Sequence, residues 1–188
     1  MGCSKLNITD YFRFIDDGIM TQCSLGVPPE SWSFTYNAEN RIIVAENAYK
    51  HLEFTYDYMG RRVSKKIYNK SGSTLTFVKE LYFIYDGYKQ IMRLRRKGTN
   101  PTPKITRKYI WMGTGAASPL VAVYQGKNMT PYYAFADANK NITEYVDANG
   151  NIAAHFEYSP FGKITKTTGS IANRFVFRFS LVERGRTR

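Results

Sequence analysis

The feature that most constrains this chain is a short turn motif that recurs along it. The motif runs over seven residues: a strand-ending residue, an Asx or Ser, two variable residues, a Gly or other turn residue, a polar residue and an aliphatic residue. An Asx side chain can bond to the backbone two residues on, and Gly or Asn at the fifth place tolerates a positive φ. Each copy therefore predicts a tight connection between two antiparallel strands.

Four segments follow the motif closely, and two follow it with changes. The close copies span residues 36–42, 136–142, 146–152 and 158–164, residues 56–63 fit with one residue inserted, and residues 85–91 fit loosely. The spacing between copies varies, so the turns recur while the strands between them differ in length. We predict structural roles for the repeat positions Tyr36, Asn37, Tyr56, Asp57, Gly60, Tyr85, Asp86, Asp137, Asp147, Gly150, Tyr158, Pro160, Phe161 and Gly162.

The segments between the turns alternate in polarity or are rich in β-branched and aromatic residues, which is typical of strands. No segment has a sustained helical period with caps at both ends. The sequence therefore predicts an all-β fold, an antiparallel meander of hairpins that forms a twisted, curved open sheet. The expected strands span residues 32–36, 41–46, 52–56, 62–68, 75–85, 91–95, 105–112, 120–124, 132–136, 142–146, 152–158 and 175–179.

Length and composition narrow the class of protein. With 188 residues, 43% of them hydrophobic, we expect one compact domain with one core. The 15% aromatic content, with 14 Gly and 7 Pro, excludes collagen-like and disordered chains. We expect no membrane span, because the longest apolar runs are only as long as a strand. We also expect no signal peptide, because the first residues lack its apolar stretch. The two cysteines, Cys3 and Cys23, are too few for a disulfide framework.

The net charge of +12 is concentrated in the middle of the chain. Residues 61–110 hold 14 basic and 2 acidic residues, with tyrosines interleaved. Such a stripe could bind an acidic glycan or a nucleic acid, and its candidate anion-binding residues are Arg93, Arg95, Arg96 and Lys97. Their alternation along a strand favours solvated strand faces instead. A free-standing basic module that binds such a polyanion is the alternative function.

Catalytic constellations are sparse in the sequence. His51 and His155 lie far apart on strand-like stretches, where a hydrogen-bonded histidine on a strand face is the expected role. Asp16 and Asp17 are adjacent, so on an extended chain their side chains point in opposite directions, and an acidic turn explains them better. We therefore expect no enzyme activity, no catalytic residue, no cofactor and no metal site.

The repeated units resemble the YD repeats of RHS proteins, which are named for segments such as Tyr56-Asp57 and the residues that follow them to Val63. The resemblance is to the RHS repeat-associated core region and covers residues 32–180. Its most specific block runs from Tyr133 through Asp137 and Asp147 to the segment Tyr158-Ser159-Pro160-Phe161-Gly162. Residues 1–31 match the repeat poorly, and residues 181–188 form a divergent basic tail.

The resemblance implies a structural function. YD repeats in bacterial members form a β-shell that encloses a toxic C-terminal segment, and related animal repeats serve adhesion. It therefore implies that the partners are the rest of an RHS shell or an effector domain of the parent protein, and that the protein is secreted or at the cell surface. Open sheet edges also predict self-association.

The end of the sequence departs from the family pattern. After Ser180 the chain continues to Arg188 without the Asp-Pro motif at which family members cut themselves, and without an effector domain. We expect a copy truncated before the self-cleavage motif, so the cleavage chemistry is carried over to no residue.

Overall fold

The computed structural model of the chain describes residues 11–14, 18–25, 30–113, 119–139, 141–169 and 171, and every regular element among them is a β-strand. Cys3, the Asp16-Asp17 pair, the strand expected at 175–179 and the tail at 181–188 lie outside the described residues. No helix among the described residues has the length and apolar character needed to cross a membrane.

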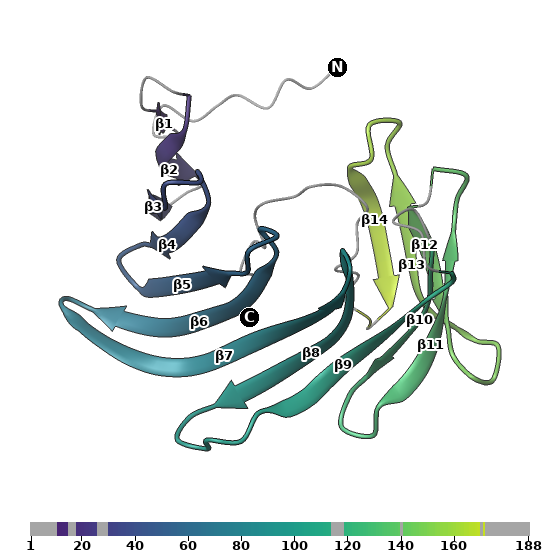
Figure 1. The fold of residues 1–188 in the computed structure, drawn as a ribbon. Helices are drawn as coiled ribbons and strands as arrows, with labels where there is room; N and C mark the ends of the chain where they lie inside the picture. The colour runs from purple at the N-terminus through teal and green to yellow at the C-terminus, as the bar shows by residue number, and fades with distance from the viewer. Residues whose placement is uncertain are drawn as a thin grey trace. The chain divides into compact units, whose positions relative to one another are not determined.

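Among the described residues, fourteen strands follow one another in chain order through a single open sheet (Figure 1), and every pair of neighbours whose register is defined there is antiparallel. This confirms the predicted all-β meander of hairpins. The strands are β1 (Tyr11–Phe14), β2 (Met20–Leu25), β3 (Glu30–Tyr36), β4 (Ile42–Glu46), β5 (Lys50–Tyr56), β6 (Arg62–Ser71), β7 (Thr74–Asp86), β8 (Lys89–Lys97), β9 (Lys104–Trp111), β10 (Leu120–Gln125), β11 (Thr130–Ala136), β12 (Ile142–Val146), β13 (Ile152–Tyr158) and β14 (Ile164–Gly169).

Three strands were not expected from the sequence: β1, β2 and β14. The segment Ile164–Gly169 has one apolar residue followed by polar ones, and all but the first are exposed. It forms a strand because its backbone pairs with β13, from Ile164 opposite Tyr158 to Gly169 opposite Ala154. Backbone pairing of this kind leaves no period-two signal in the side chains, so a pattern search misses it.

The chain divides into two compact units. Unit 1 comprises residues 1–84 and 93–105, and unit 2 comprises residues 85–92 and 106–188. The boundary passes within β7, within β8 and within β9. Each unit has its own set of buried residues.

Unit 1 buries one face of its sheet under basic side chains. The register places Phe54 opposite Lys65, and Lys65 opposite Leu81. The Lys65 side chain is only 7% exposed and its Nζ lies 5.6 Å from the centre of the Phe54 ring. The guanidinium of Arg62 lies 5.4 Å from the Phe54 ring and 5.2 Å from the Phe83 ring. Long cationic side chains therefore lie over aromatic rings of this unit.

Unit 2 has a core of mutually packed apolar residues. Tyr145 on β12 is 2% exposed and meets Phe156 on β13 edge to face at 6.2 Å between ring centroids. Burial raises the pKa of the Tyr145 hydroxyl far above its usual range. The buried members of this core are Tyr109, Leu120, Val123, Ile142, Tyr145, Ala154, Phe156 and Ile171.

Candidate functional site

The repeated turns are the most regular local feature of the molecule, and the turn at Asp57 shows how one is built. The Asp57 Oδ1 accepts hydrogen bonds from the backbone nitrogens of Met59 at 3.0 Å and Arg61 at 2.9 Å. The backbone of Asp57 donates to the Arg61 carbonyl and accepts from Gly60. Gly60 has φ = 77°, a conformation that costs other residues about 1 kcal/mol or more. One carboxylate therefore closes a five-residue loop.

Four further turns repeat this scheme. At Asn37 and Asp147 the side-chain Oδ1 again accepts from the backbone nitrogens two and four residues on. At Asp137 and Ser159 the side-chain oxygen accepts from the backbone nitrogen four residues on. All four also form the backbone bond from the second to the sixth position of the motif. Positive φ recurs at the fifth position in Asn40, Gly150 and Gly162.

Every one of these five turns is preceded by a β-bulge, and the strand pairing then joins the first and seventh positions of the motif. The pairs are Tyr36 with Ile42, Tyr56 with Arg62, Ala136 with Ile142, Val146 with Ile152, and Tyr158 with Ile164. The motif copy at residues 56–63 thus has no inserted residue, contrary to the sequence prediction. Arg62 occupies the place that an aliphatic residue takes in the other copies.

The sixth position has a role that its polarity alone did not reveal. Arg61 donates from Nε to Asp57 Oδ2 at 2.7 Å, and Asn141 donates from Nδ2 to Asp137 Oδ2 at 2.9 Å. Asn151 makes the equivalent bond to Asp147 at 3.3 Å. Both oxygens of each Asp are therefore occupied, which stabilises the carboxylate form.

These bonds lower the pKa of all three aspartates. At Asp57, desolvation acts to raise the pKa, but the bonds from the backbone and side chain of Arg61 outweigh it. At Asp137 the side-chain bond from Asn141 is the largest cause, and at Asp147 it is the backbone bond from Asn151. The repeated carboxylates are thus held as anions by their own turns.

Aromatic residues at strand ends bond one turn to the previous turn at the same edge of the sheet. The hydroxyl of Tyr36 donates to the Met20 carbonyl at 2.6 Å, and that of Tyr56 donates to the Ile42 carbonyl at 2.8 Å. In unit 2 the hydroxyl of Tyr158 donates to Ile142 at 2.6 Å. We call these three contacts, and the one described next, aromatic latches.

A fourth latch lies outside the repeated motif. Trp111, the last residue of β9, donates from Nε1 to the carbonyl of Gln90 near the start of β8 at 2.9 Å. No Asx turn of the repeat type follows Trp111 in the sequence, so the motif could not identify it. Like the three tyrosines of the other latches, Trp111 is the last residue of an odd-numbered strand.

The remaining predicted repeat positions are placed differently. Tyr85 and Asp86 end β7, and only Gly87 and Tyr88 connect it to β8, so this copy forms a shorter loop than the others. Pro160 and Phe161 lie at the tip of the turn between β13 and β14, where the Phe161 side chain is 83% exposed. Phe161 is thus an exposed residue at a turn tip and does not belong to the buried core.

Both histidines occupy the same kind of site, one in each unit. Nδ1 of His51 lies 2.9 Å from Oε2 of Glu46 on the neighbouring strand, and its Nε2 lies 3.6 Å from Glu53. Lys66, opposite Glu53 on β6, completes the set with an Nζ to Oε2 distance of 3.5 Å. This confirms that His51 is a hydrogen-bonded residue on a strand face.

Unit 2 repeats this arrangement with different residues. Nδ1 of His155 lies 3.2 Å from Glu144, its Nε2 lies 3.5 Å from Glu157, and Lys166 Nζ lies 2.9 Å from Glu157. We call each set of one His, two Glu and one Lys a histidine quartet. The side-chain bond from Lys166 is the main cause that lowers the pKa of Glu157. Charges of opposite sign facing each other across strands stabilise the pairing.

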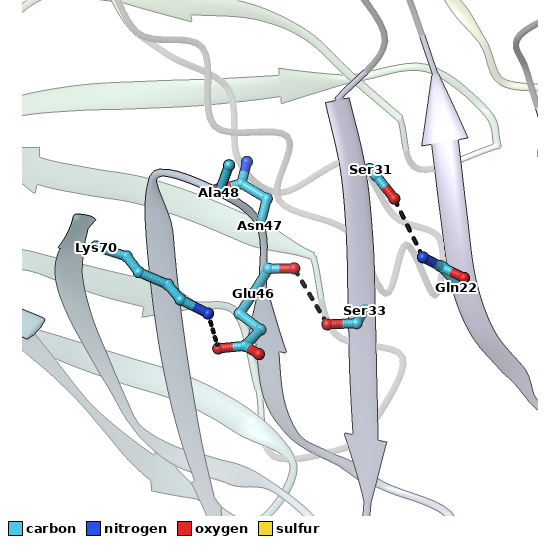
Figure 2. A pocket seen from close by; sticks show the side chains of 7 residues that line it. All are labelled: Gln22, Ser31, Ser33, Glu46, Asn47, Ala48 and Lys70. Atoms are coloured by element: carbon cyan, nitrogen blue, oxygen red, sulfur yellow. Dashed lines mark hydrogen bonds and ion pairs between the residues drawn. The ribbon is translucent and has the colours of Figure 1, made fainter. Parts of the chain in front are cut away.

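A shallow polar hollow of about 200 Å³ lies beside the first quartet, between β2, β3, β4 and β6 (Figure 2). The Lys70 ammonium points at the Glu46 carboxylate, 2.8 Å away, and Gln22 donates to Ser31 across the hollow. Lys70 first, and then His51, lower the pKa of Glu46. Glu46 is therefore an ion-paired anion and poorly suited to act as a general base.

The basic stripe is divided between the two faces of β8. The Arg96 guanidinium binds Glu80 at 2.9 Å and lies 4.6 Å from the Phe77 ring centre. Arg95 and Lys97 alternate with it and line a second hollow together with Asn100, Thr102 and Lys104. The structure thus separates Arg96 from the group with which the sequence placed it.

Two further features bear on metal and thiol chemistry in the part of the chain that the structure describes. No group of three or more His, Cys, Asp or Glu side chains there is arranged to hold a metal ion. Cys23 is buried as a free thiol opposite Trp32, and burial raises its pKa. A raised pKa lowers the thiolate fraction and with it the reactivity of the sulfur.

Comparison with known proteins gives one sequence relative and several structural neighbours. No known family profile matches the chain. The chain is 26% identical over 119 residues to salivary gland surface protein 1 of Aedes aegypti, which covers 63% of this chain and 3% of that protein. The chain thus spans a very small part of this relative's length.

Among solved structures, the TcdB2-TccC3-Cdc42 crystal structure is similar, with a TM-score of 0.46 and 14% identity, over 86% of this chain and 7% of that chain. A Photorhabdus luminescens Tc holotoxin pore that carries a TccC3 mutation is similar with a TM-score of 0.44 and 14% identity, over 84% of this chain and 10% of that chain. Likeness at this level identifies no activity, so the interpretation rests on the turns themselves.

Proposed function

We propose that this chain is a non-catalytic segment of an RHS-type repeat wall, whose role in a parent protein is to enclose or present an effector. The single observation that carries the proposal is that five turns share four features: the backbone bond between the second and sixth positions, the side-chain bond to the sixth nitrogen, one bulge position and one strand pairing. Turns that repeat in this way join hairpins into a sheet that extends by addition of further units, as in other repeat proteins.

The chemistry of the repeated residues supports a structural role. The carboxylates of Asp57, Asp137 and Asp147 accept bonds within their own turns, and the hydroxyls of Tyr56 and Tyr158 donate to backbone carbonyls. Groups that are committed to backbone partners contribute to stability and are poorly available for catalysis or ligand binding. The repetition therefore favours a structural role for these residues over a catalytic one.

One face of unit 2 also fits a wall that needs a neighbour. Ile110, Ala122 and Tyr133 lie opposite one another on β9, β10 and β11, and Val146 and Ile152 continue the row onto β12 and β13. Ile110, Tyr133 and Ile152 are exposed in this structure. Exposed apolar rows of this kind mark surfaces that other protein covers.

The test is the association state of the purified full chain, measured by size-exclusion chromatography with light scattering over a range of concentrations. We expect assemblies larger than one chain, because a wall segment exposes the edges of its sheet. The comparison variant carries Ile110→Thr, Tyr133→Thr and Ile152→Thr, which removes the apolar row and preserves β propensity. Circular dichroism checks that the variant keeps its sheet.

The two chains together separate the outcomes. Association that persists in the triple variant supports the proposal, because edge pairing then joins the copies. A monomeric wild-type chain at every concentration would contradict it. Association that disappears in the variant supports the proposal as well, because the copies are then joined through the exposed apolar row, which a neighbouring wall segment would cover.

A further inference from the structure

Most of the basic side chains of unit 1 are already used inside the unit. Arg61 binds Asp57 at 2.7 Å, Lys66 binds Glu53 at 3.5 Å, and Arg96 binds Glu80 at 2.9 Å. Arg62 and Lys65 lie over aromatic rings. The high positive charge of residues 61–110 is therefore not evidence of one broad binding stripe.

Three cations of the β8–β9 hairpin differ from this pattern. Arg95, Lys97 and Lys104 line one hollow of about 180 Å³, and none of them forms an ion pair with a carboxylate among the described residues. Arg95 and Lys97 share a face of β8 because side chains of a strand alternate. Three like charges held together without a counter-charge repel one another, and a bound anion relieves that repulsion.

The loop that closes the hollow is restrained. The Gly98 nitrogen donates to the Val78 carbonyl at 3.3 Å, and the Thr102 nitrogen donates to Asn100 Oδ1 at 2.9 Å. Pro101 and Pro103 limit the backbone on either side of Thr102. The side-chain oxygen of Asn100 accepts the bond from the Thr102 nitrogen. The side-chain amide nitrogen of Asn100 and the hydroxyl of Thr102 are therefore the donors that lie beside the three cations.

We propose that this hollow, lined by Arg95, Lys97, Asn100, Thr102 and Lys104, binds the sulfate groups of a sulfated polysaccharide. Its side chains offer positive charge and hydrogen-bond donors, which is the complement of a sulfate ester. No aromatic side chain lines the hollow, so it offers no platform on which the bases of a single-stranded nucleic acid could stack. The proposal goes beyond the wall function and does not depend on it.

The test is the binding of a fluorescently labelled heparin hexasaccharide to the full chain, measured by anisotropy at physiological salt. The site variant carries Arg95→Gln, Lys97→Gln and Lys104→Gln. The matched control carries Lys108→Gln, Lys127→Gln and Lys163→Gln, three exposed lysines that lie outside the hollow. Both variants lose the same charge, so bulk electrostatics affects them equally.

We expect the site variant to bind at least about 10-fold more weakly than wild type, because each charge-assisted bond to the ligand is lost. The control should change by less than about 3-fold, because long-range effects of exposed charges are screened by salt. Equal weakening in both variants would overturn the proposal. If the site variant loses its β-sheet circular dichroism, the single changes Lys97→Gln and Lys104→Gln, each against Lys163→Gln, decide instead.

A duplex DNA of similar length is the competing ligand in the same assay. If it binds the wild-type chain at least as tightly as the hexasaccharide, and weakens in the site variant, the assignment to a sulfated polysaccharide is wrong. Weaker DNA binding, with little difference between the two triple variants, supports the assignment.

Discussion

In unit 1, cations lie over several aromatic residues of the sheet, whereas in unit 2 the most deeply buried aromatic residues pack on one another. Arg62 and Lys65 lie over Phe54, while Tyr145 and Phe156 meet edge to face in a core that excludes water. The turns that join the strands are nevertheless the same in both units. The repeat therefore determines how strands connect, and it does not determine how the apolar surface of each unit is covered.

The largest expected difference comes from removing one aromatic ring in each unit. Phe156→Ala should destabilise unit 2 by about 3–5 kcal/mol, because the ring is fully buried and leaves a cavity. Phe54→Ala should cost clearly less, because Phe54 is half-buried and the flexible side chains over it can move. Hydrogen exchange followed by mass spectrometry reports each unit separately. Equal losses would remove the distinction between the two units.

Two glycines with similar backbone angles allow the cost of backbone strain to be measured separately from the cost of a steric clash. Gly150 and Gly169 have φ of 86° and 85°, but a Cβ on Gly150 meets open space and one on Gly169 meets the backbone of Ala153. Gly150→Ala should therefore cost about 1 kcal/mol of strain. Gly169→Ala should cost more, because strand β14 must also move away from β13. Urea unfolding of both variants measures the difference, and similar values would show that β14 shifts freely.

The aromatic latches are expected to contribute equally in the two units. Tyr56→Phe and Tyr158→Phe each remove one hydrogen bond and should each lower stability by about 1 kcal/mol. Tyr58→Phe is the control, since the Tyr58 side chain is almost fully exposed. Thermal unfolding of the three variants tests this. A control as damaging as the latches would show that the hydroxyl bonds do not stabilise the turns.

The smallest expected effect is the response of the turns to acid and salt. Because the pKa values of Asp57 and Asp147 are lowered in the folded chain, their contribution is present above about pH 4 and is lost as the pH falls through the folded values. Asp57→Asn keeps the Oδ1 acceptor, as Asn37 does, and should flatten the loss of melting temperature as the pH falls below about 4.

Salt distinguishes the two turns further. Asp57 is paired with the cation Arg61, whereas Asp147 is bonded by the neutral Asn151. Raising the salt concentration should therefore weaken the turn at Asp57 more than the turn at Asp147. Hydrogen exchange at Arg61 and Asn151 at two salt concentrations measures this, and an equal response at both would argue against the ion pair.

Much of the fold could be predicted because its signals are local. Asx or Ser at the second position and Gly at the fifth identified the turns at Asp57, Asp147 and Ser159, and alternation identified the strands between them. The strands β1, β2 and β14 were missed, because a strand that depends on pairing with a neighbour needs no apolar period of its own. An insertion was wrongly assigned to residues 56–63, because Arg62 takes a place where an aliphatic residue was expected.

The candidate sites depended more on contacts between distant residues. Arg93, Arg95, Arg96 and Lys97 are consecutive or nearly so, yet Arg96 binds Glu80 on the opposite face from Arg95 and Lys97. The histidine quartets could not be found either, since Glu46 and Glu144 face their histidines only through strand register. Register is set by turn lengths and bulges over several hairpins, so no single residue of the sequence identifies it.

The amino-acid sequence by itself determined that the chain is a series of antiparallel hairpins, because turn geometry is decided within a few neighbouring residues. Only the tertiary structure decided which side chains meet across strands: the latch from Trp111 to Gln90, the two histidine quartets and the hollow of the β8–β9 hairpin. The physical reason is that a bulge of one residue moves a side chain to the other face of a sheet, so contacts depend on the register of every strand at once.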